Sequence, residues 1–231
     1  MGCEPDERGR GFGQFGQHVE QLHRVTLSHG FYMAKYPTTQ RQYEAVMGNN
    51  PSEYKGEDHP VEITKWRNAI AFCEELNELQ LDCVPDGYAF RLPTESEWES
   101  ACRSGARTAL NSGVNLRSAD WVCQNLDEVG WYWQNAGKLG HHAVGCKRPN
   151  ARGLYDMHGN VWEVVQDWYR EGYATRPVRD PVGPGSGDYH VMRGGSWSAF
   201  PRYCRSASRA PFVPRKSHGD VGFRVVLALI L

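Results

Sequence analysis

Apolar side chains three and four residues apart predict three helices in the first half of the chain. Each is expected to begin at a threonine, whose side chain can accept a hydrogen bond from a free backbone N–H of the first turn. These threonines are Thr39, Thr64 and Thr94, and Gln42 and Glu97 complete capping boxes after the first and the third. The inward-facing residues are expected to be Tyr43, Val46, Met47, Trp66, Ala69, Ile70, Cys73, Leu76, Trp98, Ala101 and Cys102.

Runs of β-branched and aromatic residues predict short strands on either side of these helices. The strands are expected within residues 23–27, 30–35, 161–168, 189–193 and 221–229, and a further strand should end at Arg91. Residues 2–17 have no periodicity and are expected to form a loop. The stretches between the later strands are rich in Gly, Asn, Asp, Pro and Trp, which predicts long ordered loops of the kind that often carry function.

No linker, repeat or charge block divides the chain, so we expect one α+β domain over residues 1–231, loop-rich, with few helices and short antiparallel strands. The net charge of −1 and the absence of a Lys/Arg run argue against nucleic acid as a partner. No signal peptide is visible, and the apolar end from Val225 is too short to cross a bilayer. We therefore expect no membrane insertion and favour the cytoplasm or a virus particle as the location.

The cysteines give no metal or disulfide pattern. The chain has 7, an odd number, without a C-x-x-C pair or an evident Cys/His spacing for a metal. Cys73 and Cys102 lie on the apolar faces of predicted helices. Most of the cysteines are expected to be reduced and partly buried, which favours a reducing compartment.

Several motifs together resemble the formylglycine-generating-enzyme (sulfatase-modifying factor) domain family, a branch of the C-type lectin fold. They occur in order over nearly the whole chain and are specific as a set. Most of them are expected to determine the fold rather than the chemistry. The motifs are Gly30–Met33, Pro37–Gln40, His59–Val61, Phe90–Glu99, Gly153–Glu163, Arg193–Trp197 and Gly222–Val226.

The resemblance implies a test for catalysis. Enzymes of this family oxidise a substrate cysteine and hold copper between two cysteines five positions apart, which correspond here to Ala199 and Cys204. A linear thiolate site for a soft metal needs both sulfurs, so we expect no copper and no enzymatic activity. The alternative is an oxidase acting through Cys204 alone, with His190 or His218 as a base if either lies close to it.

The segment 193–224 resembles the variable region of proteins diversified by diversity-generating retroelements, which share this fold. Those systems randomise adenines, often in AAC codons, which cannot then encode Met, Trp, Gln, Lys or Glu. None of the candidate positions carries an excluded type, although Lys216 lies among them and must be fixed if the interpretation holds. The candidate variable positions are Ser198, Ala199, Phe200, Tyr203, Ser208, Ala210, Phe212, Val213, His218, Gly219 and Asp220.

The sequence therefore predicts a scaffold with an exchangeable binding face for a protein or other macromolecule, whose identity depends on the variant. Aromatic residues mixed with small polar ones are typical of adaptable binding surfaces. Trp197, Phe200, Tyr203 and Phe212 are the preferred contact residues, with Trp197 partly structural. Two alternatives stay open: these aromatics could pack inward, or the chain could be an interaction module without diversification.

The resemblance also implies a structural calcium site. Its ligands would come from Asp156, Gly159, Val161 and Glu163, as two carboxylates with backbone carbonyls between them. Asn160 is expected to support the turn instead. In the alternative interpretation, Asp156 and Glu163 only accept hydrogen bonds from the protein.

Overall fold

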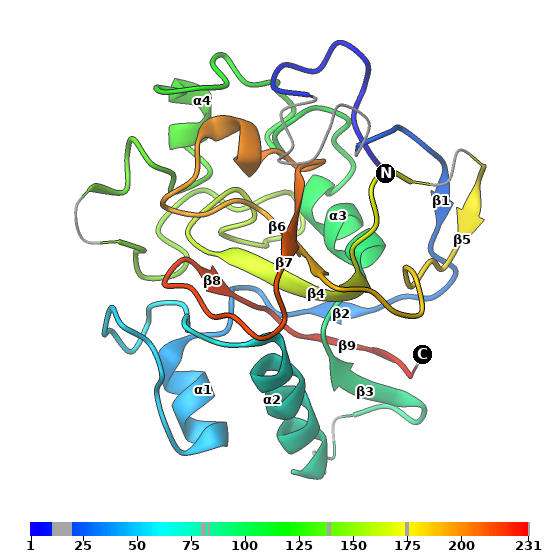
Figure 1. Ribbon diagram of the computed structural model, residues 1–231, viewed down its shortest axis with the longest axis vertical. Helices are drawn as coiled ribbons and strands as arrows, with labels where there is room; N and C mark the ends of the chain where they lie inside the picture. Colours follow the sequence, from blue (N-terminus) through cyan, green and yellow to red (C-terminus); the bar gives the residue numbers. More distant parts are fainter. Residues whose placement is uncertain (11–19, 80–81, 83, 138–139, 174–175, 231) are drawn as a thin grey trace.

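The structure is a computed structural model that describes residues 1–10, 20–79, 82, 84–137, 140–173 and 176–230 (Figure 1). In Figure 1, α1 and α2 lie at one end of the molecule, and long loops with α4 lie at the other end. Part of the N-terminal loop predicted over residues 2–17 lies outside the described residues. No helix in the described part is long and apolar enough to span a membrane.

The helices confirm the predicted capping signals with one shift. Thr39 caps α1 (Gln40–Met47) and Thr94 caps α3 (Glu95–Arg103), each in a complete capping box. The second helix, α2 (Trp66–Glu78), has Lys65 rather than Thr64 as its N-cap residue. The short helix α4 (Gln124–Asp127) and the 3-10 helix η2 (Pro201–Cys204) were not predicted, since four residues are too few for a periodic pattern.

In the part of the chain that the structure describes, the strands form three small sheets. β1 (Val25–Thr26) pairs with β5 (Val178–Arg179), and β9 (Val226–Leu229) lies between β2 (Tyr32–Met33) and β3 (Tyr88–Arg91). The largest sheet has the order β7 (Arg209–Phe212), β6 (His190–Arg193), β4 (Trp162–Trp168), β8 (Val221–Gly222).

Two strand predictions need correction. The β1–β5 and β4–β8 pairs are parallel, so the strands are not all antiparallel. The strand predicted over residues 221–229 is two strands in different sheets, β8 beside β4 and β9 beside β2 and β3. The chain leaves one sheet for the other at Phe223–Val225, where the backbone instead bonds to Thr38 and Ala34.

The described residues form three apolar clusters in the interior. One lies between α1, α2 and the largest sheet and includes the stacked rings of Tyr43 and Phe72. Another packs Trp98 of α3 against β4 and β6. The remaining cluster surrounds α4 and includes Ala199 and Cys204, so the C-terminal segment is part of the core as well as of the surface.

Candidate ligand-binding face

Buried arginines anchor the C-terminal segment at intervals. Each forms an ion pair with a buried glutamate from another part of the chain, and all four arginines are at most 5% exposed. Removing one partner of such a pair leaves an uncompensated buried charge, so replacing either residue should destabilise the fold. The pairs are Arg193–Glu99, Arg205–Glu20, Arg209–Glu95 and Arg224–Glu163.

These ion pairs hold the arginines of the segment in place. Arg209 and Arg224 each make two parallel hydrogen bonds of 2.7 Å to one carboxylate. Such paired bonds fix both the position and the orientation of a side chain. The four arginines therefore fix the path of the segment through the interior.

Trp197 connects the two ends of the segment. Its indole N–H donates to the carbonyl of Gly219 at 3.1 Å, and its backbone N–H donates to the carbonyl of Asn160. The ring of Tyr54 meets the Trp197 ring edge to face at 5.8 Å. Trp197 is thus partly structural, as expected: its hydrogen bond holds Gly219 beside residues 197–200.

A serine–aspartate group lies next to this tryptophan. The hydroxyls of Ser196 and Ser198 donate to Asp220 Oδ2 at 2.9 and 2.6 Å. Ser196 is fully buried, whereas Ser198 and Asp220 are partly exposed. The two candidate positions 198 and 220 therefore touch each other across the segment.

The exposed aromatic residues beside this segment come from a different part of the chain. The Trp121 ring meets the Phe200 ring edge to face at 5.3 Å, and the backbone N–H of Trp133 donates to the carbonyl of Ala199. Trp121 is 61% exposed and Trp133 51%. We define the candidate face as these residues with their neighbours: Tyr54, Trp121, Trp133, Trp197, Ser198, Phe200, Gly219 and Asp220.

Four of the predicted contact positions are buried. Ser208 directly precedes β7 and Ala210 lies within it, and both are buried. Phe212 is 2% exposed and packs into the cluster between α1, α2 and the largest sheet. Ala199 is 8% exposed beside α4. We therefore leave Ala199, Ser208, Ala210 and Phe212 out of the candidate face: the segment 209–212 is a strand paired with β6 rather than a loop.

The three remaining positions lie at the margin of the face or below it. Tyr203 is half-buried and packs toward Trp162, with 6.5 Å between ring centroids. Val213 is half-buried directly after β7, and His218 is exposed with its ring 6.4 Å from that of Phe212. Of these, His218 is the one most available to a ligand, since it directly precedes Gly219.

Cys204 lies in the interior. Its side chain is fully buried beside Gly195, where a Cβ would come within 2.5 Å of Cys204 Sγ. Burial raises the pKa of the Cys204 thiol well above its usual range. A thiol with a raised pKa is a weak nucleophile, because the reactive form is the thiolate.

Among the described residues, no hydrogen bond joins either candidate base to this thiol, which donates to the carbonyl of Phe200. His190 is held between the rings of Trp66 and Trp168, 3.8 Å from each, and its Nδ1 faces the carbonyls of Gln166 and Asp167. Burial lowers the pKa of His190 to about 4. His218 is exposed near Phe212.

The carboxylates of the expected calcium site face protein donors. Glu163 accepts two hydrogen bonds from Arg224 and one from the indole of Trp98, and Asp156 accepts one from the backbone of Gly145 at 2.8 Å. The side chain of Val161 is buried. At Gly159, a Cβ would lie 2.0 Å from the carbonyl oxygen of Trp131, which explains the glycine.

Asn160 supports the turn, as expected. Its side chain bonds to both the backbone N–H and the carbonyl of His142, at 2.9 and 3.1 Å. In the described part of the chain, no three His, Cys, Asp or Glu side chains are grouped to hold a metal ion. Calcium at Asp156, Gly159, Val161 and Glu163 stays a prediction, which a change in melting temperature on adding calcium or a chelator would support.

The fold and its motifs agree with comparisons to known proteins. Residues 7–229 match the family described as sulfatase-modifying factor enzyme 1-like domain. The chain belongs to this family. It has the α+β, loop-rich C-type lectin fold that the motifs predicted.

The similar proteins have different functions in their names. The chaperone protein LppX of Paenibacillus barcinonensis is 31% identical over 87% of this chain and 81% of its own. The formylglycine-generating enzyme of Streptomyces coelicolor is 36% identical over 72% of this chain, which spans 52% of that enzyme's length. The solved structure of Treponema denticola variable protein 1 has a TM-score of 0.80 and 30% identity, covering 98% of this chain and 93% of that chain.

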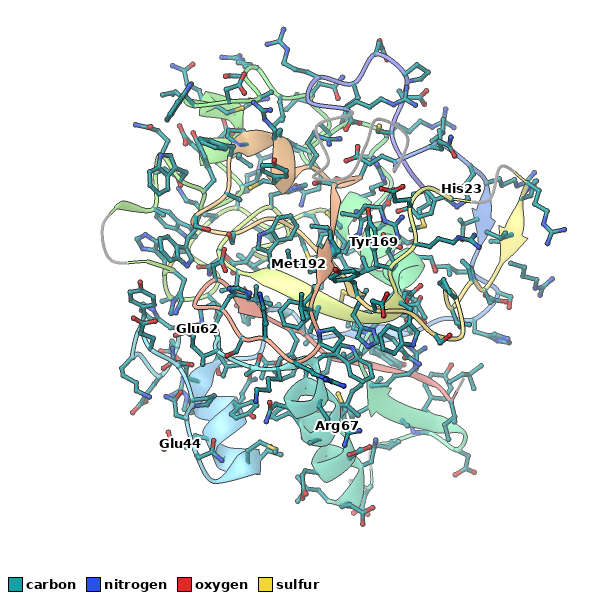
Figure 2. The ribbon with its side chains drawn as sticks, in the orientation of Figure 1. His23, Glu44, Glu62, Arg67, Tyr169 and Met192 are labelled. Carbon is teal, nitrogen blue, oxygen red and sulfur yellow. The ribbon has the colours of Figure 1, made fainter. Side chains whose placement is uncertain are left out.

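The sequence did not predict which residues surround the segment 193–224. Trp121, Trp133 and Tyr54 lie far from it in sequence, and only the high tryptophan content hinted at exposed indoles. Glu62 was also missed: it is fully buried, and its Oε2 has no hydrogen-bond partner among the described residues. That oxygen lies behind Gly219, 3.8 Å from where a Cβ would be, on the side of α1 and β8 (Figure 2).

Proposed function

We propose that this chain is a ligand-binding protein whose candidate face differs between variants of the same scaffold. One observation carries the proposal: within residues 193–224, the buried arginines that anchor the segment alternate with partly exposed positions. The anchors pair with distant glutamates, and the positions between them meet the exposed Trp121 and Trp133. The likeness to Treponema denticola variable protein 1 over nearly the full length of both chains supports the same function.

The ligand is proposed to be a protein or another macromolecule. Four cavities formed by described residues are lined by residues outside the candidate face. A small molecule needs to be largely enclosed, whereas the exposed indoles of Trp121 and Trp133 suit a broad partner. Exposed tryptophans beside small polar residues are typical of the contact points that contribute most of the binding energy.

A catalytic function is the second candidate, favoured by the identity with the formylglycine-generating enzyme. The residues present do not fit the copper site of such enzymes: Ala199 offers no ligand, and Cys204 is a fully buried thiol. We therefore propose that the chain is not an oxidase. Incubation with copper and a cysteine-containing peptide should leave the peptide unchanged, and formation of an aldehyde on it would favour the oxidase.

Two libraries test the binding function. The first randomises Ser198, Phe200, His218 and Gly219 together, and the matched second randomises Ser208, Ala210 and Phe212. We expect most members of the first to fold, with members that bind different target proteins recoverable by display. Most members of the second should fail to fold, because their positions are buried. Equal losses of folding in the two libraries would contradict the proposal, and so would a folded first library without binders.

An interaction module without diversification remains the third possibility, in keeping with the name of the chaperone protein LppX. It predicts the same fold and the same exposed tryptophans but one fixed partner. In that case the natural sequence would bind its partner far better than any library member, and variants of this gene would not differ at the exposed positions.

A further inference from the structure

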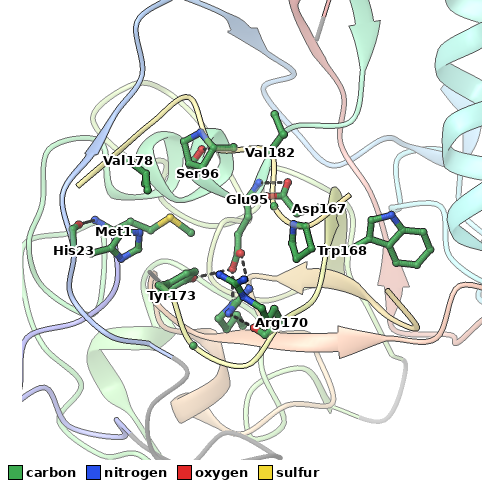
Figure 3. A pocket seen from close by; sticks show the side chains of 15 residues that line it. Met1, His23, Glu95, Ser96, Asp167, Trp168, Arg170, Tyr173, Val178 and Val182 are labelled. Atoms are coloured by element: carbon green, nitrogen blue, oxygen red, sulfur yellow. Dashed lines mark hydrogen bonds and ion pairs between the residues drawn. The ribbon is translucent and has the colours of Figure 1, made fainter. Parts of the chain in front are cut away.

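A cavity of about 220 Å³ has no residue of the candidate face in its lining. Figure 3 shows it from close by. It is formed between the start of α3, the end of β4 and residues 178–184. His23, one of its lining residues, is beside β1 in Figure 2, whereas Glu62 behind the candidate face is on the opposite side. Nothing in the proposed function uses this cavity.

One part of its wall is an ion pair that is already satisfied. Arg209 bonds to both oxygens of Glu95 at 2.7 Å and to the carbonyl of Arg170 at 2.9 Å. The Tyr173 hydroxyl donates to Glu95 at 2.9 Å, and the Arg209 guanidinium lies 4.4 Å from the Tyr173 ring. The charges of Glu95 and Arg209 cancel, so this pair gives the cavity little net charge.

Asp167 is the group without a matching partner. It is 5% exposed, and its Oδ2 accepts a hydrogen bond from the backbone N–H of Glu95 at 2.8 Å. Its Oδ1 has no hydrogen bond, and the carboxylate no ion pair, among the described residues. Because Oδ2 already has a donor, Oδ1 is the oxygen of this carboxylate that is open to a ligand in the cavity.

One side of the lining is apolar. It consists of the ring of Trp168 and the side chains of Val178, Pro181, Val182 and Pro184. The lining also includes Met1, His23, Ser96 and Arg170. Gly183 has φ +74°, and a Cβ there would lie 2.9 Å from the Cβ of Asp167, so the glycine lets the chain pass closely over the carboxylate. The carboxylate of Asp167 thus lies beside the apolar side of the cavity.

We propose that this cavity binds a small amine, whose ammonium group donates to Asp167 Oδ1 and whose apolar body packs against Trp168 and Val182. An apolar cavity of about 150 Å³ accommodates benzene, so a volume of 220 Å³ suits a molecule of roughly nine or ten non-hydrogen atoms. A carboxylate or phosphate group placed beside Trp168 and Val182 would meet the negative charge of Asp167.

Binding of an amine should depend on pH through Asp167. Burial, reinforced by the charge of Glu95, raises the pKa of Asp167 to about 7. Below that pH the carboxyl is increasingly protonated and attracts a cation less, so amine affinity should increase from pH 6 to pH 8. The titratable and charged groups around it are Glu95 and Glu97 of α3, Arg209 of β7, His190 of β6, and Arg170, Tyr173, His23 and the amino group of Met1 along the cavity.

The test uses two probes of the same shape, 2-phenylethylamine and the neutral 2-phenylethanol, titrated calorimetrically into the full chain at pH 8. The amine should bind at least tenfold more tightly than the alcohol. Asp167→Asn should bring the amine to the level of the alcohol, whereas Asp188→Asn, which removes a nearby exposed carboxylate, should change neither. At pH 6 the amine should bind several-fold more weakly to the wild type.

A second variant keeps the test independent of the stability of Asp167→Asn. Val182→Trp should fill the cavity from its partly exposed rim and abolish binding of both probes. Equal affinities for amine and alcohol would overturn the proposal, as would undiminished amine binding to a folded Asp167→Asn variant. Absence of any amine binding to the wild type at pH 8 would overturn it as well.

Discussion

The two phenylalanines of the C-terminal segment should respond very differently to replacement by alanine. Phe212 is 2% exposed and packs into the cluster between α1, α2 and the largest sheet. Replacing a core phenylalanine by alanine costs about 3–5 kcal/mol, from lost burial and the cavity left behind. Residue 212 is paired with His190 in the sheet, which limits how far the backbone can collapse into that cavity. We therefore expect Phe212→Ala to lower the free energy of unfolding by about 4 kcal/mol.

Phe200 is half-buried, and its main aromatic neighbour is the exposed Trp121, 5.3 Å away between ring centroids. An aromatic pair contributes about 0.5–1.5 kcal/mol beyond burial, and the rest of this ring is already in contact with water. We expect Phe200→Ala to lose about 1 kcal/mol of the free energy of unfolding. The difference between the two variants should then be at least about 2 kcal/mol.

Urea denaturation followed by the fluorescence of the 8 tryptophans measures both variants under the same conditions. The denaturant dependence should be unchanged, so that the shift in midpoint reports stability alone. Equal losses at the two positions, or a larger loss at Phe200, would refute the assignment of Phe200 to the surface and Phe212 to the core. The candidate face would then have to be redrawn.

Three further predictions follow from the anchors, the glycines and the cavity. Arg224→Met should cost about 3–5 kcal/mol because it leaves the charge of Glu163 buried without its ion-pair partner, and Glu163→Gln added to it should restore part of the loss in urea denaturation. Gly195→Ala should lower the melting temperature strongly, since φ is +75° and a Cβ would meet Cys204 Sγ at 2.5 Å, whereas Gly219→Ala, with no atom closer than 3.4 Å, should be nearly neutral. Asp167 has a folded pKa of about 7 against a reference of 3.8, so the native state holds the proton more tightly and stability should fall as pH rises from about 4 to about 7. Asp167→Asn should lose that slope in melting temperature measured across this range, and an unchanged slope would contradict the assignment.

The fold was predictable where the signals are local. Thr39 and Thr94 cap their helices because a cap depends on residues three positions apart. The boundary at Thr64 moved by one residue to Lys65, since tertiary contacts decide where the first turn begins. The strand 209–212 was missed because its arginine and proline resemble loop composition, and its pairing with β6 is a long-range property.

The candidate site was predictable only in part, for a related reason. The order of the motifs located the segment. The sequence does not show which of its arginines are buried, because Arg193 and Arg224 form ion pairs with Glu99 and Glu163, which lie far away in the chain. The exposed indole of Trp121 likewise belongs to the face through a contact with Phe200 that no local pattern encodes. Asp167 meets Glu95 across 72 positions, so its cavity has no sequence signature.

The central claim is that the partly exposed positions of 193–224 differ between variants while the buried anchors stay fixed. The nucleotide sequence encoding this segment and its flanks tests that claim most directly. We predict a near-copy of the segment that differs from it only where the copy has adenine, with the differences at partly exposed positions such as Ser198, Phe200 and Gly219, and none at Arg193 or Arg224. No such copy, or differences spread equally over anchors and exposed positions, would contradict it.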